Sequence, residues 1–488
     1  MEYLKTCIVL LCFITIAFSK SVRQQDSAKA ELEEYISNKK PEINHRYRPL
    51  YHVAGPVGWI NDPNGFTHYK GEYHLFFQFY PYDSVWGPMH WGHVASSDLV
   101  NWKELPTALL PEEEQCFSGS AVVDGDTMVL IYTGHLITEI DPFYNETQYL
   151  AISEDGVDFT KYEGNPVIPA APNGSPDFRD PKAWRYGDYW YVIIGSKTAD
   201  QRGRVLLYRS EDLISWEFLN VLGESDGSLG YMWECPDFFE LNGKHVILMS
   251  PQGMEPVGDR YHNIHQTGYI IGNFNYDTFE FVPETQFQEI DFGHDFYAAQ
   301  TTEHDGKRYL VAWFNSWEKA IPETEDGWSG IMTMVREIRL SNNRIYMTPV
   351  EPISSLRDET GIAGNLEPGE TLTFDKAAEI SVEGDLNNGF IISIEGSEGG
   401  DLVWLSWNPE TEKVALNRNG DIRQVEWRPE GSRAWRIFLD ASSLEVFCGE
   451  GEVVFSSRVY PAGGWKVTNI GTQNLNVEAY SLKRSVPV

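Results

Sequence analysis

Apolar stretches recur in pairs along the first 350 residues, and each pair is followed by a polar turn that ends in an aromatic residue. Typical pairs are MVLIYTG with YLAISEDGVDF, and YWYVIIGSK with VLLYRSEDLISW. The closing aromatic residues recur at intervals of about 60 residues and are Trp102, Phe159, Trp216 and Phe279. A unit of this length has room for about four strands, the size of one propeller blade.

A fifth unit begins near Tyr309, in YLVAWFNSW. The pattern therefore predicts an all-β fold that starts with a five-bladed β-propeller over residues 46–350. A β-solenoid would also be built from repeated strands, but the unit is too long and contains no short internal repeat.

The pattern changes near residue 355, where short alternating strands follow one another without that period. FIISIEG, DLVWLSWNP and KVALNRNG are examples of these strands. Such a series is typical of an antiparallel β-sandwich, which we place at residues 351–488.

The N-terminus has a different character. Lys5 precedes an apolar stretch from Cys7 to Phe18, which is followed by the small residue Ser19. Residues 1–19 are therefore interpreted as a secretory signal peptide, too short for a membrane span, and we expect a secreted, extracellular protein. Residues 20–45 are charged and Gln-rich and are expected to be a mobile arm. The sequons at Asn145 and Asn173 are candidate glycosylation sites.

Three of the five cysteines lie outside the expected signal peptide, namely Cys116, Cys235 and Cys448. Their number is odd and no CxxC spacing occurs, which excludes a disulfide framework and a zinc site. One disulfide among them would still be allowed, but buried free thiols are the preferred interpretation.

Composition and charge narrow the choice of partners. The formal net charge of −34 argues against nucleic acid and against an anionic membrane. The 16 Trp, 25 Tyr and 25 Phe suit strands, and they also suit stacking surfaces for sugar rings.

Acidic residues recur at one phase of the repeat. The first strand of each blade lines the axis of a propeller, so residues at the same phase of successive units converge. The segments at this phase are GWINDPNGF with Asp62, FSGS with Ser118, FRDPKAW with Asp180, MWECPDFF with Glu234, and HDFYAAQT with Asp295 and Tyr297. The carboxyl groups of Asp62, Asp180 and Glu234, which come from three blades, are therefore expected to face one funnel.

Each of these acids also has a structural explanation. Asp62 precedes a Pro-Asn-Gly turn and could bond the backbone locally, and Asp180 could form an ion pair with Arg179. Glu234 is harder to explain in this way, because burying a lone carboxylate beside Trp233 is costly. The shared phase favours function for all three.

The surroundings of the acids also differ. Arg179 is expected to keep Asp180 ionised, whereas the apolar neighbours of Glu234 are expected to raise its pKa. A carboxylic acid facing a carboxylate is the arrangement used in glycoside hydrolysis. Gln78, Trp86, Trp313 and the FSGS segment could supply hydrogen bonds and a stacking floor for a sugar.

An ordered set of motifs resembles glycoside hydrolase family 32, the β-fructofuranosidases, from about His52 to near the C-terminus. The motifs are WINDPNG, FSGS, FRDP, WECPD, DFYAAQT, GWSGIMTMVREIRL and FLDASSLEVF. The resemblance implies a five-bladed propeller with a β-sandwich, and cleavage of terminal β-fructofuranosides with retention. It makes Asp62 the nucleophile, Asp180 the transition-state stabiliser and Glu234 the acid/base.

The resemblance also implies a fructose site and no metal or organic cofactor. The implied substrate-binding residues are Trp59, Asn61, Gln78, Trp86, Phe117, Ser118, Arg179, Tyr297 and Trp313. The expected substrate is sucrose, with raffinose or short fructans as further small carbohydrates. Two alternatives stay open: a fructosyltransferase, which would make oligofructans from concentrated sucrose, and a non-catalytic carbohydrate-binding propeller, which would release no glucose.

Overall fold

The computed structural model describes residues 27–487 except 173, 318 and 359, in two units that divide after Ile43. The first unit contains a helix over residues 27–39 and the 3-10 turn η1 (Lys40–Glu42). This segment is helical because SAKAELEEYISNK is rich in helix-forming residues and holds neither Gly nor Pro, and the mobility of the arm stays a prediction. The expected signal peptide and Asn173 lie outside the described residues. Within the described ranges, no helix is both long enough and apolar enough to span a bilayer.

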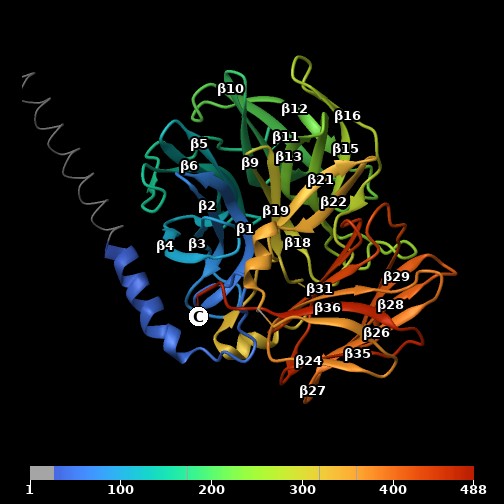
Figure 1. The fold of residues 1–488 in the computed structure, drawn as a ribbon. Helices are drawn as coiled ribbons and strands as arrows, with labels where there is room; N and C mark the ends of the chain where they lie inside the picture. Colours follow the sequence, from blue (N-terminus) through green and yellow to red (C-terminus); the bar gives the residue numbers. More distant parts are fainter. Residues whose placement is uncertain (1–26, 173, 318, 359, 488) are drawn as a thin grey trace, which may run out of the picture. The chain divides into compact units, whose positions relative to one another are not determined.

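Residues 58–349 form five sheets that follow one another along the chain (Figure 1). The first contains β1 (Gly58–Tyr69), β2 (Glu72–Tyr80), β3 (His90–Ser96), β4 (Lys103–Leu109) and β20 (Trp328–Ser329). The second contains β5 (Gln115–Asp124), β6 (Thr127–Ile137), β7 (Tyr144–Ser153) and β8 (Thr160–Lys161). The third contains β9 (Phe178–Tyr186), β10 (Tyr189–Lys197), β11 (Gly203–Ser210) and β12 (Glu217–Glu224).

The fourth sheet contains β13 (Met232–Leu241), β14 (Lys244–Gln252), β15 (Gly268–Asn275), β16 (Glu280–Pro283) and β17 (Gln288–Glu289). The fifth contains β18 (Tyr297–His304), β19 (Lys307–Trp313), β21 (Arg336–Ser341) and β22 (Arg344–Pro349). The 3-10 turn η2 (Pro322–Asp326) precedes β20.

The first strands of the five sheets form a closed ring. Each of β1, β5, β9 and β13 contacts the next first strand, and β18 contacts β1 again. β20 also pairs in parallel with the start of β1, so chain segments from the two ends of the domain are joined in one sheet. This is the arrangement of a β-propeller, in which radial repetition leaves only short sheet edges.

Strand β10 shows why the repeats read as continuous apolar runs. Val192 and Ile194 pack against the second sheet, whereas Tyr191 and Ile193 pack against the fourth. Since side chains alternate across a strand and both faces of an inner sheet are covered, both sets of positions must be apolar.

Each first strand has an irregular register near the same end of the ring. The shifts fall between Ile60 and Pro63, between Cys116 and Gly119, opposite Ile193–Gly195, between Glu234 and Asp237, and between Tyr297 and Gln300. Three residues there, Asp180, Cys235 and Ala298, adopt left-handed backbone with φ of 64°, 45° and 57°. A bulge re-aims side chains and ends regular pairing, and such bulges are common beside functional sites.

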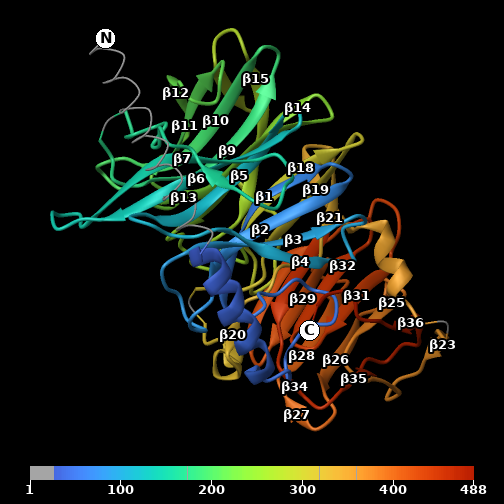
Figure 2. The same ribbon diagram turned by 90° about the vertical axis from the view of Figure 1, so that its left-hand side faces the viewer.

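After the 3-10 turn η3 (Glu351–Leu356), the chain forms a sandwich of two six-stranded sheets (Figure 2). One sheet contains β23 (Ile362–Leu366), β36 (Leu475–Ser481), β25 (Ala378–Glu383), β31 (Trp435–Asp440), β32 (Ser443–Cys448) and β33 (Val453–Arg458). The other contains β24 (Thr371–Phe374), β35 (Trp465–Asn469), β26 (Phe390–Gly396), β28 (Leu402–Asn408), β29 (Lys413–Arg418) and β30 (Asp421–Glu426). The short strands β27 (Gly399–Gly400) and β34 (Pro461–Ala462) pair with each other. Trp427, Trp435 and Trp465 are fully buried between the two layers.

A buried ionic network joins the propeller to the sandwich. Arg336 donates to Asp291 at 2.8 Å within the propeller, and to Glu445 and Ser456 of the sandwich at 2.5 Å each. His52, which precedes β1, contacts Glu445 through Nε2 at 2.8 Å. Because Arg336 and its carboxylate partners are fully buried, the charges depend on one another for stabilisation.

Replacing Arg336 by Met is therefore expected to lower the free energy of unfolding by about 3–5 kcal/mol, since Asp291 and Glu445 would lose their buried counter-charge. Urea denaturation followed by circular dichroism measures this change. Arg428→Met is the matched control, because it breaks an exposed pair with Glu412 and should cost less than about 1 kcal/mol. Equal effects of the two substitutions would contradict a structural role for the buried network.

Candidate active site

A cleft of about 420 Å³ opens where the bulged ends of the first strands meet. It is lined by Asn61, Asp62, Gln78, Trp86, Phe117, Ser118, His135, Tyr144, Glu146, Asp177, Arg179, Asp180, Glu234, Gln252, His265 and Trp317. The structure therefore brings together all three predicted carboxyl groups and most of the predicted substrate-binding residues.

Three predicted contact residues lie beneath the cleft instead of on its surface. Trp59, Tyr297 and Trp313 are buried in one apolar cluster with Met89 and Ala298. The indole N–H of Trp59 donates to Asn61 Oδ1 at 2.8 Å, and so orients a side chain that does line the cleft. The three side chains thus lie in a supporting position, and their implied fructose contacts stay predictions.

Asp62 lies at the bulge of β1 with its two oxygens in different surroundings. Oδ2 accepts a hydrogen bond from the hydroxyl of Ser118 at 2.8 Å and from the thiol of Cys235 at 3.5 Å. Oδ1 is buried and accepts no hydrogen bond of normal geometry from the described residues. Burial first, and then repulsion by Glu234, raises the pKa of Asp62. Oδ2 is thus held by two donors, whereas Oδ1 is enclosed by protein atoms.

Asp180 depends on backbone donors. Its Oδ2 accepts from the N–H of Cys235 at 2.9 Å, and its own N–H donates to the hydroxyl of Thr133 at 2.9 Å. Burial raises the pKa of Asp180 well above its usual range, and repulsion by Glu234 and Asp62 adds to this despite the attraction of Arg179. Arg179 lowers the pKa of Asp180, as expected, but burial opposes this effect and the net direction is upward.

The guanidinium of Arg179 pairs with other acids. Nη2 and Nε donate to Glu234 Oε1 at 2.7 and 3.1 Å. Nη1 donates to Glu146 at 3.3 Å and to Asp177 at 3.2 Å. The suggested ion pair between Arg179 and Asp180 is replaced by this three-carboxylate arrangement. Gly195, opposite Arg179, makes it possible, because a Cβ there would lie 2.3 Å from the carbonyl oxygen of Trp233 and would force the third and fourth sheets apart.

Both oxygens of Glu234 accept hydrogen bonds. Besides the contacts of Arg179 to Oε1, the phenol of Tyr297 donates to Oε2 at 2.5 Å. Burial, followed by the charge of Glu234, raises the pKa of Tyr297 well above its usual range, so the phenol stays protonated and remains a donor. Glu234 is therefore oriented from both sides, although its side chain is still 16% exposed to the cleft.

Aromatic and amide side chains form the remaining wall. Trp86, 46% exposed, stands edge-on to Phe117, while Gln78 is fixed by a hydrogen bond to the carbonyl of Cys116 at 2.8 Å. Trp317 stacks on Trp59 with ring centroids 5.7 Å apart. Exposed aromatic faces beside fixed polar groups are typical of sites that bind sugars.

Sequence reasoning missed seven lining residues: His135, Tyr144, Glu146, Asp177, Gln252, His265 and Trp317. Asp177 lies immediately before the predicted Phe178-Arg179 pair, and Trp317 lies four residues after Trp313, so proximity in sequence was a usable signal for these two. His135 stacks on Phe117 and on Tyr144, with ring centroids 4.2 and 5.2 Å apart. It lies on β6, the second strand of its sheet, whereas the repeat phase locates only residues on the first strand of each sheet.

Cys116, Cys235 and Cys448 are free thiols, as preferred from the sequence. No group of three His, Cys, Asp or Glu side chains in the described part of the chain is arranged to hold a metal ion. The cleft presents carboxyl groups in unequal surroundings, with Arg179 and hydroxyl donors beside them.

Comparison with known proteins agrees with this geometry. Residues 52–349 match the model of the glycosyl hydrolases family 32 N-terminal domain, and residues 351–482 match that of the family 32 C-terminal domain. A sucrose-6-phosphate hydrolase of Zymomonas mobilis is 39% identical over 86% of this chain and 88% of its own length. A raffinose invertase of Escherichia coli is 38% identical over 85% of this chain and 89% of its own length.

Solved structures show the same relationship. A family 32 β-fructofuranosidase of Bombyx mori has 61% identity and a TM-score of 0.93, covering 95% of this chain and 100% of its own. A sucrose-6-phosphate hydrolase of Lactobacillus gasseri has 26% identity and a TM-score of 0.85, covering 93% of this chain and 97% of its own. Because the two family models match residues 52–482 almost without a gap, the chain belongs to glycosyl hydrolase family 32 and is a glycoside hydrolase.

Proposed function

We propose that this enzyme hydrolyses sucrose, and related small β-fructofuranosides such as raffinose, by double displacement with retention of configuration. The observation that carries the proposal is the placement of Asp62, Asp180 and Glu234 in one cleft. Among its relatives are a β-fructofuranosidase of Bombyx mori, a mutant of which has been solved in complex with sucrose, and a raffinose invertase.

In the first step, the carboxylate of Asp62 attacks the anomeric carbon of fructose and forms an ester bond. The bond to the glucosyl oxygen breaks, and Glu234 gives its proton to that oxygen. In the second step, Glu234 takes a proton from water, whose oxygen attacks the same carbon and releases Asp62. Oε1 of Glu234 accepts two hydrogen bonds from Arg179, whereas Oε2 accepts one from Tyr297 and retains a lone pair for the transferred proton.

The other residues hold the sugar and the acids. Asp180 is assigned to fructose hydroxyl groups, where it stabilises the positive charge that develops on the ring. Asn61, Gln78 and Ser118 supply further hydrogen bonds, while Trp86 and Phe117 supply apolar contact. Arg179 and Tyr297 orient Glu234.

The charge of the cleft favours a substrate without phosphate. Its lining includes five carboxyl groups, of Asp62, Glu146, Asp177, Asp180 and Glu234. Among the described lining residues, Arg179 alone has a permanent positive charge, and its N–H groups face three of those carboxylates. A phosphate dianion would meet like charge there without a free cation, so we propose sucrose as the substrate in preference to its 6-phosphate.

Secretion belongs to the same proposal. The signal-peptide pattern in residues 1–19 and the exposed sequon residue Asn145 support a glycosylated, extracellular enzyme.

Asp62→Asn and Glu234→Gln separate the two catalytic roles. On sucrose, we expect Glu234→Gln to lower kcat about 10²–10⁴-fold and Asp62→Asn at least about 10³-fold. On a nitrophenyl fructofuranoside, whose leaving group needs no proton, Glu234→Gln should still show a burst of nitrophenol and Asp62→Asn should not. Stopped-flow absorbance measures the burst. A burst from Asp62→Asn would contradict its role as nucleophile, and oligofructans in place of free fructose would indicate a transferase.

Comparison of three substrates tests the charge argument. We expect kcat/KM for sucrose to exceed that for sucrose 6-phosphate at least about tenfold, because the phosphate approaches five carboxyl groups and one guanidinium that is already paired. Raffinose is the matched control, since it carries a neutral and larger group at the same glucose position. A preference for the phosphate ester, or equal losses with both substituted sugars, would show that charge does not select the substrate.

The pH dependence tests the coupling between Asp62 and Glu234. Burial and the Glu234 charge raise the pKa of Asp62, so kcat/KM should fall on the acid side as Asp62 becomes protonated. Glu234→Gln removes the repulsion and lowers that pKa, so the acid limb on the nitrophenyl substrate should shift to lower pH. Glu412→Gln, on the sandwich surface, should leave the limb in place. A shift to higher pH in Glu234→Gln would contradict the electrostatic coupling.

A further inference from the structure

One wall of the cleft is formed by a loop that the sandwich holds. Residues 314–327 connect β19 to β20, and Trp317 in this loop lines the cleft. Trp317 packs on Trp59 and also on Trp313, with a centroid separation of 4.8 Å for the second pair. Its ring is 39% exposed, so a ligand can reach it.

Contacts to the sandwich lie on both sides of Trp317. Arg458, at the end of β33, donates to Asn315 Oδ1 at 2.6 Å and to Glu323 Oε1 at 2.7 Å. Lys319 donates to Asp421, at the start of β30, at 2.9 Å. Arg458, Asn315 and Glu323 are all buried, whereas the Lys319–Asp421 pair is partly exposed.

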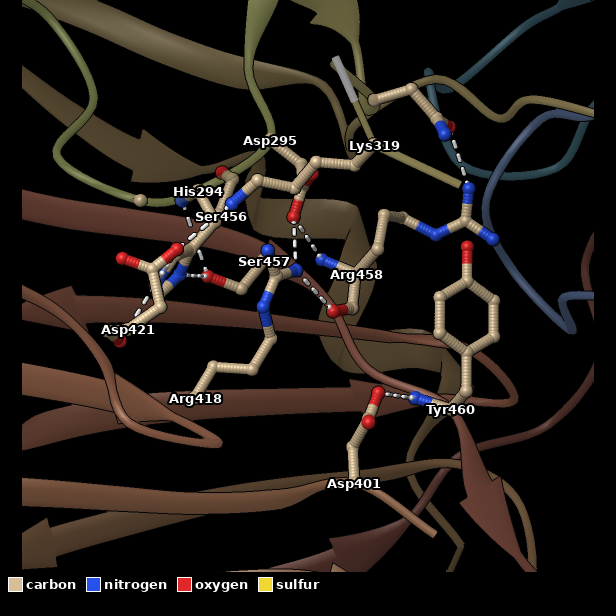
Figure 3. Close-up of polar contacts among 12 residues, drawn as sticks. His294, Asp295, Lys319, Asp401, Arg418, Asp421, Ser456, Ser457, Arg458 and Tyr460 are labelled. Atoms are coloured by element: carbon tan, nitrogen blue, oxygen red, sulfur yellow. Dashed lines mark hydrogen bonds and ion pairs between the residues drawn. The ribbon is translucent and has the colours of Figure 1, made fainter. Parts of the chain in front are cut away.

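Arg458 is itself fixed on the sandwich side. Its Nε donates to the carbonyl of Ser442 at 3.0 Å, and its backbone N–H donates to Asp295 at 2.8 Å. Figure 3 shows the side chain of Arg418 and the backbone of Arg458 converging on Asp295, with Arg418 at 2.5 Å. Asp295 does not line the cleft, because two sandwich residues hold its carboxylate.

The same network reaches the support of Glu234. Asp295 lies two residues before Tyr297, and the neighbouring His294 contacts the hydroxyl of Ser457 at 2.8 Å. The sandwich thus forms hydrogen bonds with the chain at the cleft end of the fifth sheet, both before β18 and after β19.

We infer that the β-sandwich sets the position of the Trp317 wall, with Arg458, Asn315 and Lys319 as positioning residues for substrate binding. This inference rests on the proposed function, since it assigns Trp317 to substrate contact. Because the three residues act through Trp317 and none of them lines the cleft, their loss should weaken substrate binding more than it slows the chemical step.

Asn315→Leu and Lys319→Met test the inference, with steady-state kinetics on sucrose as the readout. Each should raise KM about 3- to 30-fold with a smaller change in kcat, since Trp317 loses its fixed position. Asn315→Asp, which keeps an acceptor for Arg458, should stay near the wild-type KM. Lys413→Met is the matched control: Lys413 also joins sandwich to propeller, through Asp259 on another loop, and its loss should leave KM within about twofold.

A Trp317→Ala background separates positioning from general stability. There, Asn315→Leu should raise KM no further, because the side chain through which it acts is gone. Additive effects in that background, or KM changes in Asn315→Leu and Lys319→Met no larger than in Lys413→Met, would overturn the inference.

Hydrogen exchange of the full-length variants gives a readout without substrate. Backbone amides of residues 314–327 should exchange faster in Asn315→Leu than in wild type or Lys413→Met. Unchanged exchange in an enzyme that hydrolyses sucrose would overturn this inference alone. Absence of glucose release by wild type would refute the proposed function, while faster exchange would still support the anchoring of the loop.

Discussion

Mutual repulsion among Asp62, Asp180 and Glu234 is the constraint to which the surrounding structure responds. Three acids in one buried cleft destabilise one another's charged forms, and the raised pKa values of Asp62 and Asp180 record that cost. The protein offsets it with hydroxyl, thiol and backbone donors at Asp62 and Asp180, and with the Arg179 guanidinium at Glu234.

The three carboxyl groups are held by different sets of hydrogen-bond donors, and this difference suits them to different catalytic roles. Asp62 is held through one oxygen by Ser118, Asp180 is held by the backbone N–H of Cys235, and Glu234 is held through both oxygens. These differences arise from bulges and left-handed residues, which a ring of first strands places side by side. The ring in turn depends on the sandwich, which fixes Asp295 and the Trp317 loop at the cleft end of the fifth sheet. Catalytic geometry and domain packing are thus parts of one polar framework.

Much of this could be predicted from the residues. The propeller followed by a sandwich could be predicted from the sequence. Strands that are apolar on both faces, such as YWYVIIGSK, recur at a regular period in the propeller. The convergence of Asp62, Asp180 and Glu234 followed from their common phase, which needs no knowledge of side-chain contacts. The helix at residues 27–39 was not predicted, because the charge and Gln content of this region suggested a mobile arm although its residues have high helix propensity.

The sequence by itself determined the fold class, the family and the carboxyl groups that meet, because periodicity and motif order are properties of the chain alone. Tertiary structure decided how the charges pair. Arg179 is adjacent to Asp180 in sequence, yet neighbours along a strand point to opposite sides unless a bulge intervenes, and here the guanidinium crosses to Glu234 on the next sheet. It also decided that Trp59, Tyr297 and Trp313 support the cleft from below and that Trp317 faces it, since depth beneath a surface depends on packing between sheets and leaves no periodic signal.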